Sequence, residues 1–202
     1  MFESHTDRDI SVAGQAGARA EVGGRVELKN TYLLEAYGPP RWFDYLLQGF
    51  GLLGAVMGPL KWVESVDNIV TTAGLNDALD KHLKGSGYTA SWFVGLTDGA
   101  PTVAAADTLP SHAGWDEVTA YAGNRPALQL GAVAAGSANN SSNRASFSIN
   151  ANSTVIGGAF LASVASGASG VLYSVAAFAA GNKQLDSGDT LNVTVTCTAT
   201  SP

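Results

Sequence analysis

The segment DTLNVTVTCTA, residues 189–199, indicates the fold class because apolar and polar side chains alternate along it. Leu191, Val193, Val195 and Cys197 would face a core, while the intervening asparagine and threonine side chains would face the other way. This period of two, with many β-branched residues, is typical of a strand in an antiparallel sheet. Cys197 is the only cysteine, and its inward position predicts a core residue rather than a reactive thiol.

Similar short apolar segments precede it, separated by turn-forming sequences such as GSANNSSN, NANS and LDSGD. Short strands spaced by about 8–12 residues favour a β-sandwich over a parallel sheet. The fold is therefore predicted to be mainly β, an antiparallel β-sandwich or jelly-roll-like domain. The predicted strands are residues 25–38, 60–66, 91–97, 116–121, 127–133, 145–150, 154–163, 170–178 and 189–199.

One short helix is predicted in TTAGLNDALDKHLKG, residues 71–85, where leucines recur at helical spacing. It should cover about residues 72–84, with Thr72 as the N-cap and with Gly85 ending the helix in a left-handed backbone conformation. Several glycines interrupt residues 1–24, so an extended N-terminal arm is expected there.

The domain itself is predicted to span residues 25–202, with an apolar insertion at about 39–59. The dipeptide Gly-Pro occurs at both ends of this insertion, at 38–39 and again at 58–59. The insertion is therefore interpreted as an excursion between two paired strands. A connection of this length is usually functional or disordered, and disordered segments are poor in apolar residues.

The sixteen residues from Tyr45 to Leu60 carry no charge, so they must be buried somewhere. A membrane-spanning helix needs about 20 apolar residues, and this run is shorter and rich in glycine, so no membrane partner is expected. Burial against other protein subunits is the remaining hypothesis. The predicted interface residues are Trp42, Phe43, Tyr45, Leu46, Phe50, Leu52 and Leu53.

Composition narrows the classes of partner. Only 14% of residues are charged, against about 25% in an average protein, and the net charge is −6. No basic surface is expected, so nucleic acid is not a predicted partner. The opening sequence MFESHTDRDISV contains no apolar stretch of the kind that a secretory signal requires, so such a signal is predicted to be absent.

Neither a catalytic residue nor a metal or cofactor site is predicted. Asp107, Ser111 and His112 are neighbours in sequence, but the members of a catalytic triad usually come from distant segments, and no G-x-S-x-G motif is present. Asp98, Asp107 and Asp116 do not match the spacing of a calcium loop and are interpreted as turn formers.

The chain is similar to a family of small virion-associated proteins of tailed bacteriophages. The resemblance rests on SWFVGL (91–96), DTLPSHAGW (107–115), RPALQLGAV, ASFSIN, IGGAFLAS and SGDTLNVTVT. It covers about residues 25–38 and 60–202, whereas at residues 39–59 the family has a short polar turn. It implies a structural component of the virion, without catalytic residues.

The expected function is therefore that of a non-enzymatic bacteriophage virion structural protein, foremost a capsid decoration or cement protein that bridges capsid subunits. A tail, collar or fibre component is the alternative within this class. Its partners would be the major capsid protein or tail proteins and copies of itself, and it would be assembled in the cytoplasm of the bacterial host and located in the virion.

A carbohydrate-binding module is the alternative from another class. Its ligand would contact exposed aromatic rings, for which Trp115 and Tyr121 are the candidates. Trp92 lies within an apolar strand and is expected to pack in the core instead.

Overall fold

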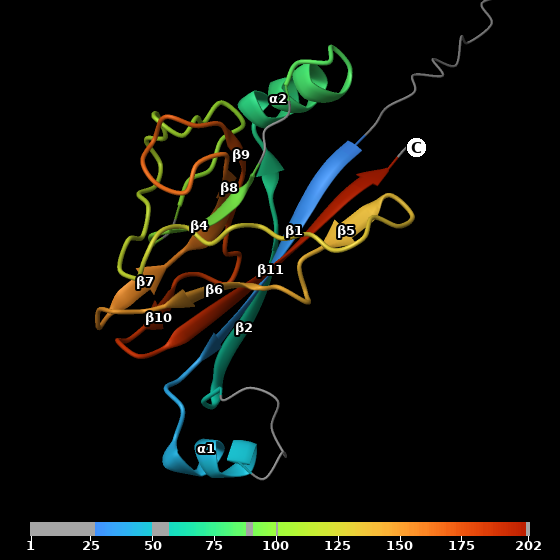
Figure 1. Ribbon diagram of the computed structural model, residues 1–202. Helices are drawn as coiled ribbons and strands as arrows, with labels where there is room; N and C mark the ends of the chain where they lie inside the picture. Colours follow the sequence, from blue (N-terminus) through green and yellow to red (C-terminus); the bar gives the residue numbers. More distant parts are fainter. Residues whose placement is uncertain (1–26, 50–56, 88–90, 100, 201–202) are drawn as a thin grey trace, which may run out of the picture.

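The structure is a computed structural model that describes residues 27–49, 57–87, 91–99 and 101–200 (Figure 1). The elements in these residues are β1 (Glu27–Tyr37), α1 (Trp42–Gly49), β2 (Leu60–Asp67), β3 (Ile69–Val70), α2 (Thr72–His82), β4 (Phe93–Thr97), β5 (Ser137–Asn139), β6 (Ala145–Ser148), β7 (Thr154–Ile156), β8 (Gly158–Ala162), β9 (Leu172–Ala177), β10 (Lys183–Leu185) and β11 (Thr190–Thr200). The predicted arm, residues 1–24, lies outside the described residues.

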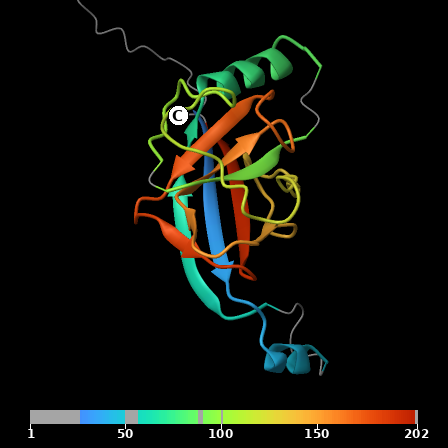
Figure 2. The same ribbon diagram turned by 90° about the vertical axis from the view of Figure 1, so that its left-hand side faces the viewer.

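The strands form two main antiparallel sheets, which confirms the predicted mainly β, sandwich-like fold. One sheet has the order β2-β1-β11-β5, and β6 also pairs with β11. The other has the order β3-β9-β8-β4, and β7 and β10 form a short separate ladder. In Figures 1 and 2, α2 lies at one end of these layers and α1 at the opposite end.

The central strands β1 and β11 pair over their whole length, from Glu27 opposite Thr200 to Tyr37 opposite Thr190. Leu191, Val193 and Val195 of β11 are fully buried, as their alternation predicts. The neighbouring polar residues of β11 are also covered in its first half, because Asn192 and Thr194 are less than a tenth exposed. The predicted alternation is therefore correct for the apolar face, but the polar face is not a solvent face there.

The core lies between the two sheets, and one buried polar contact within it joins β1 to β9. The hydroxyl of Tyr32 on β1 lies 2.7 Å from the hydroxyl of Ser174 on β9, and both residues are fully buried. Burial raises the pKa of Tyr32 well above its ordinary value, so its hydroxyl stays protonated. The core side chains include Leu34, Val94, Leu96, Phe147, Ile156, Leu161, Leu185, Leu191 and Val193.

The first hairpin confirms that the insertion is an excursion between paired strands. β1 pairs with β2 from Thr31 opposite Asp67 to Tyr37 opposite Leu60. The two Gly-Pro dipeptides meet at its end, where the Gly38 amide donates to the Pro59 carbonyl at 2.9 Å. A side chain at Gly58 would collide with the Gly38 carbonyl oxygen, so glycine is required at this close approach.

The prediction of a single helix is wrong, because α1 forms within the insertion. Its start resembles a capping box, since the Asp44 carboxylate accepts a hydrogen bond from the Arg41 amide at 2.7 Å. The Asp44 amide in turn donates to the Arg41 carbonyl at 3.0 Å. These two contacts satisfy polar groups at the first turn and give an eight-residue helix a defined start.

The one predicted helix is confirmed as α2, but its N-cap is Thr71 rather than Thr72. The Thr71 hydroxyl accepts from the Gly74 amide at 3.0 Å and also donates to the Leu172 carbonyl on β9. A side chain at Gly74 would lie 2.3 Å from the backbone oxygen of Tyr173, so α2 packs directly on β9. Beyond the helix, Gly85 has the predicted left-handed conformation, with φ of +81°.

Two predicted strands are wrong, since residues 116–121 and 127–133 contribute only isolated bridges. Their β-forming residues are held by tertiary contacts instead of a continuous ladder. The predicted strand 154–163 divides at Gly157 into β7 and β8. β3, β5 and β10 are short strands that no predicted segment covers.

Candidate functional site

The tip helix, defined as Trp42, Phe43, Tyr45 and Leu46 of α1, is unusually apolar for a surface. These side chains are 78%, 50%, 57% and 45% exposed, respectively. Both views place α1 beyond the ends of β1 and β2, apart from the body of the molecule (Figures 1 and 2). The predicted interface residues Phe50, Leu52 and Leu53 lie outside the described residues.

This arrangement holds an apolar surface in a defined position. The rings of Trp42 and Phe43 meet edge to face, with centroids 5.8 Å apart. The capping interaction of Asp44 orders the first turn, and the paired strands β1 and β2 connect the helix to the core. Single exposed apolar residues are normal on protein surfaces, but a contiguous exposed group marks an interaction site.

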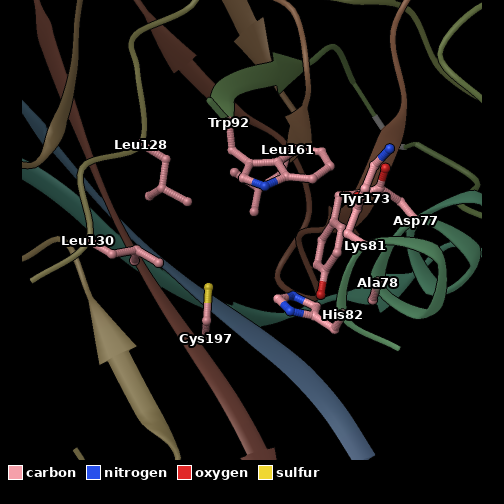
Figure 3. Close-up of a pocket in the computed structure, with 10 residues that line it drawn as sticks. All are labelled: Asp77, Ala78, Lys81, His82, Trp92, Leu128, Leu130, Leu161, Tyr173 and Cys197. Atoms are coloured by element: carbon pink, nitrogen blue, oxygen red, sulfur yellow. The ribbon is translucent and has the colours of Figure 1, made fainter. Parts of the chain in front are cut away.

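A second apolar feature lies at the opposite end, beside α2 (Figure 3). It is a cavity of about 220 Å³ between the two sheets. Its lining comes from six parts of the chain: Asp77, Ala78, Lys81 and His82 of α2, Trp92 before β4, Leu128 and Leu130 of an irregular segment, Leu161 of β8, Tyr173 of β9 and Cys197 of β11.

A second cavity of about 490 Å³ adjoins the first and extends toward the beginning of β1, at Leu28 and Asn30. The two cavities share His82, Leu130, Tyr173 and Cys197 in their linings. The second is also lined by Leu28, Val133 and Ala138, among others. We refer to the two cavities together as the end groove.

The end groove combines an aromatic wall, a partly buried thiol and polar side chains. The rings of Trp92 and Tyr173 meet at 60°, with centroids 5.0 Å apart, and form an aromatic wall. Burial raises the pKa of the Cys197 thiol to about 11, so the thiol is protonated at neutral pH and is a poor nucleophile. Burial also raises the pKa of Tyr173. Asp77, Lys81 and His82 supply the polar part of the lining.

The prediction that Trp115 is an exposed ligand-contact ring is wrong, because Trp115 is only 5% exposed. Its ring stacks on His112 with centroids 3.7 Å apart and packs against Phe160 at 5.2 Å. Its indole nitrogen donates to the Asp107 carboxylate at 3.2 Å. The surrounding loop thus folds over the ring, which anchors that loop to the second sheet.

Tyr121 is likewise buried, at 6% exposure, so the same correction applies to it. Its ring meets Phe147 edge to face at a centroid distance of 4.9 Å. Burial raises the pKa of Tyr121 to about 12. Neither aromatic residue can stack on a sugar without unpacking the core.

The loop around His112 is organised by local hydrogen bonds. The Nδ1 atom of His112 lies 2.9 Å from the Trp115 carbonyl oxygen. The Asp107 carboxylate accepts from the Ala104 amide, and Ser111 pairs with Thr108 through backbone hydrogen bonds in both directions. These interactions account for the loop as a structural feature.

The acidic turn residues also have structural roles. The Asp98 carboxylate accepts from the Asp116 amide at 3.0 Å, which joins two loops. Among the described residues, no group of three or more His, Cys, Asp or Glu side chains is arranged to hold a metal ion. In the same part of the chain, no helix is long and apolar enough to cross a membrane.

No family model, curated protein or solved structure matches the chain in the comparisons made. The function must therefore be argued from the two apolar surfaces and their surroundings.

The sequence indicated the apolar residues of the tip, but neither the helix that carries them nor the end groove. An uncharged, aromatic run outside the strand pattern was a sufficient signal for the tip. Trp92 and Cys197 were expected in the core, and they line the groove at the end of the core beside α2. The alternation of residues along a strand predicts which side chains face inward, but not whether they fill the space between the sheets.

Proposed function

We propose that the protein is a non-enzymatic structural component of a bacteriophage virion, foremost a capsid decoration or cement protein, that attaches to other virion proteins through the tip helix. The observation that carries the proposal is the exposure of Trp42, Phe43, Tyr45 and Leu46 on a helix held away from the core. The resemblance of the remaining chain to virion-associated proteins supports the class of function.

The energetics favour a role for the tip helix in assembly. Fully burying one large apolar side chain contributes about 1.5–3 kcal/mol. Even three such side chains would offset much of the cost of bringing two molecules together, which is about 4–15 kcal/mol. A virion repeats each contact many times under symmetry, so a modest interface suffices to hold a protein on it.

The low charge of the tip helix is consistent with this role. Between Trp42 and Gly49 the only charged residue is Asp44, and its carboxylate is already used at the helix start. Charged residues are depleted at the cores of protein interfaces, and aromatic residues are enriched there. The tip helix has this composition.

The proposal is tested by incorporation into virions. A Trp42→Ala, Tyr45→Ala double variant should fold normally but be lost from purified particles, because it lacks the central aromatic anchors. Val63→Ala is the matched control, since Val63 is 48% exposed on β2, outside the tip helix. Incorporation of the double variant at the wild-type level would refute a role for the tip helix.

The same particles separate the capsid hypothesis from its alternative. Immunogold labelling distributed over the shell is expected for a decoration protein. Labelling restricted to the tail, collar or fibres would replace that role with the alternative. Absence of the protein from all purified particles would refute the proposed function as a whole.

A further inference from the structure

The two apolar surfaces of this chain lie at opposite ends and have opposite shapes. The tip helix projects from one end, and the end groove is a concavity beside α2 at the other (Figures 1 and 3). A single copy cannot bring these two surfaces together, because the sheets separate them. Two copies can.

We propose that the tip helix of one copy inserts into the end groove of a second copy, so that copies join head to tail. This inference rests on the proposed function, because it names the partner of the same tip helix. The occupant of the groove is thus a second copy of this chain, and the aromatic side chains of α1 are the inserted groups.

The size of the groove fits an aromatic side chain. An apolar cavity of about 150 Å³ is large enough to bind benzene. The first cavity of the groove has about 220 Å³ and opens into the second, of about 490 Å³. The rings of Trp92 and Tyr173 line it and offer edges and faces for the edge-to-face packing that aromatic pairs favour.

Charge does not oppose contact between these two surfaces. The chain carries a net charge of −6, so copies repel one another on average. Arg41 and Asp44 give the tip region one positive and one negative charge. Lys81 and Asp77 give the first cavity the same balance. Lys81 already pairs with Asp80, and the Asp44 carboxylate accepts from the Arg41 amide, so these groups add no net repulsion to the contact.

The area available predicts a weak contact. A buried aromatic side chain covers roughly 150–250 Å², so the exposed fractions of Trp42, Phe43 and Tyr45 amount to roughly 300–450 Å². A standard interface buries about 800 Å² on each partner. Isolated pairs should thus form only at high concentration, whereas a ring or filament would gain from the repetition of the contact.

Head-to-tail contacts have a distinctive consequence. An open head-to-tail assembly keeps one free tip at one end and one free groove at the other, so further copies can add. Such contacts produce closed rings or open filaments, whereas a symmetric contact between two tips stops at a dimer. The assembly size therefore distinguishes this proposal from packing of α1 on α1.

The first test uses Cys197, the only cysteine of the chain, as a reporter within the groove. Leu46→Cys places a second thiol on the tip helix and leaves its three aromatic residues intact. Mild oxidation at alkaline pH should give a ladder of dimers, trimers and larger species joined through positions 46 and 197. Val63→Cys, on the outside of β2, is the control and should give no ladder through Cys197.

The second test mixes two variants that cannot assemble alone. Trp42→Ala removes the main anchor, and Leu130→Trp fills a position shared by both cavities. Each variant should raise the dissociation constant for self-association by at least ~10-fold in sedimentation equilibrium. A mixture of the two should form a 1:1 dimer and nothing larger, because each supplies the surface that the other lacks.

Several results would overturn the inference. Disulfides that join only position 46 to position 46 would indicate symmetric packing of two tips. A wild-type protein that stays monomeric at millimolar concentration, or a mixture that forms no dimer, would exclude the contact. A small molecule found by native mass spectrometry in the groove would make that molecule the occupant. If the wild-type protein does not self-associate but the Trp42→Ala, Tyr45→Ala variant is still lost from virions, only this inference fails and the proposed function stands, so the two failures are distinguishable.

Discussion

Excision of the insertion should leave a folded and more stable domain. Residues 40–58 would be replaced by Asn-Gly, so that Pro39, Asn and Gly connect Gly38 to Pro59. A three-residue hairpin loop commonly has a type I turn followed by a left-handed residue, and Pro, Asn and Gly suit those positions in order. The hydrogen bond between the Gly38 amide and the Pro59 carbonyl, at 2.9 Å, already closes the strand ends.

The magnitude follows from what the segment buries. Among the described side chains between Arg41 and Gly49, none is buried, so excision removes no described side chain from the core. Shortening a loop from about 20 residues to three is between two and three halvings, each worth about 0.6 kcal/mol of closure entropy. The variant should therefore gain about 1.5 kcal/mol, which raises the melting temperature by about 3–6 °C in a domain of this size.

Thermal unfolding followed by circular dichroism, together with urea unfolding, measures this gain. The variant should also be more soluble and monomeric at all concentrations, because the tip helix is absent. A melting temperature lowered by several degrees, or an unfolded product, would show that the insertion is part of the core. The interface role proposed for the tip helix would then be wrong.

Three further predictions concern the body of the molecule. Gly95→Ala should lower the free energy of unfolding in urea by about 1–3 kcal/mol, because its new Cβ would lie 2.1 Å from the Phe160 ring. An unchanged midpoint of urea unfolding would show that the ring can move. Arg125→Ala should lower the free energy of unfolding by about 3–5 kcal/mol, since Arg125 is 4% exposed and donates twice to Glu117 at 2.6 Å. The added change Glu117→Gln should recover part of this loss. Equal stability of the single and double variants would contradict the pairing. Burial raises the pKa of Cys197 from 9.0 to about 11, so the stability that its proton contributes is present below pH 9 and is lost as the pH rises toward 11. Iodoacetamide should correspondingly react about 100-fold more slowly at pH 8 than with a free thiol, and a rate that levels off near pH 9 would refute the shift.

The general fold could be predicted because local pattern and tertiary burial agree in the long strands. β11 shows the clearest case, where Leu191, Val193 and Val195 alternate with polar residues and are all fully buried. The hairpin of β1 and β2 was equally predictable, because matching Gly-Pro dipeptides mark the two ends of the insertion between these strands. Strong periodicity over many residues leaves few alternatives to a sheet.

The helix α1 was missed although its sequence contains a usable signal. The glycines of the insertion lower its intrinsic helix propensity. Asp44 lies three residues after Arg41, which is the position from which a carboxylate reaches back to the N-cap amide. This spacing, directly after Pro39 and Pro40, is a sequence signal for a helix start.

The exposed-aromatic hypothesis failed because exposure depends on distant parts of the chain. Trp115 lies in a turn-rich segment and Tyr121 at the end of the predicted strand 116–121, and neither position carries a sequence signal for burial. Their burial requires Phe160 on β8 and Phe147 on β6, which approach only after the sheets have formed. Irregular segments that pack through such contacts carry no periodic signal.

The end groove differs from the tip helix in how much sequence can reveal, and the reason is geometric. A convex apolar site shows itself as too many apolar residues for the local structure, as the run after Arg41 does. A concave site is lined by residues that resemble ordinary core: Tyr173 and Cys197 face inward on their strands, and Leu128 approaches from an irregular segment. The groove exists because these side chains leave space between them, and that space is a property of their packing in three dimensions. Its occupant therefore has to be inferred from the structure, and the other end of the same chain supplies an apolar surface that can fill it.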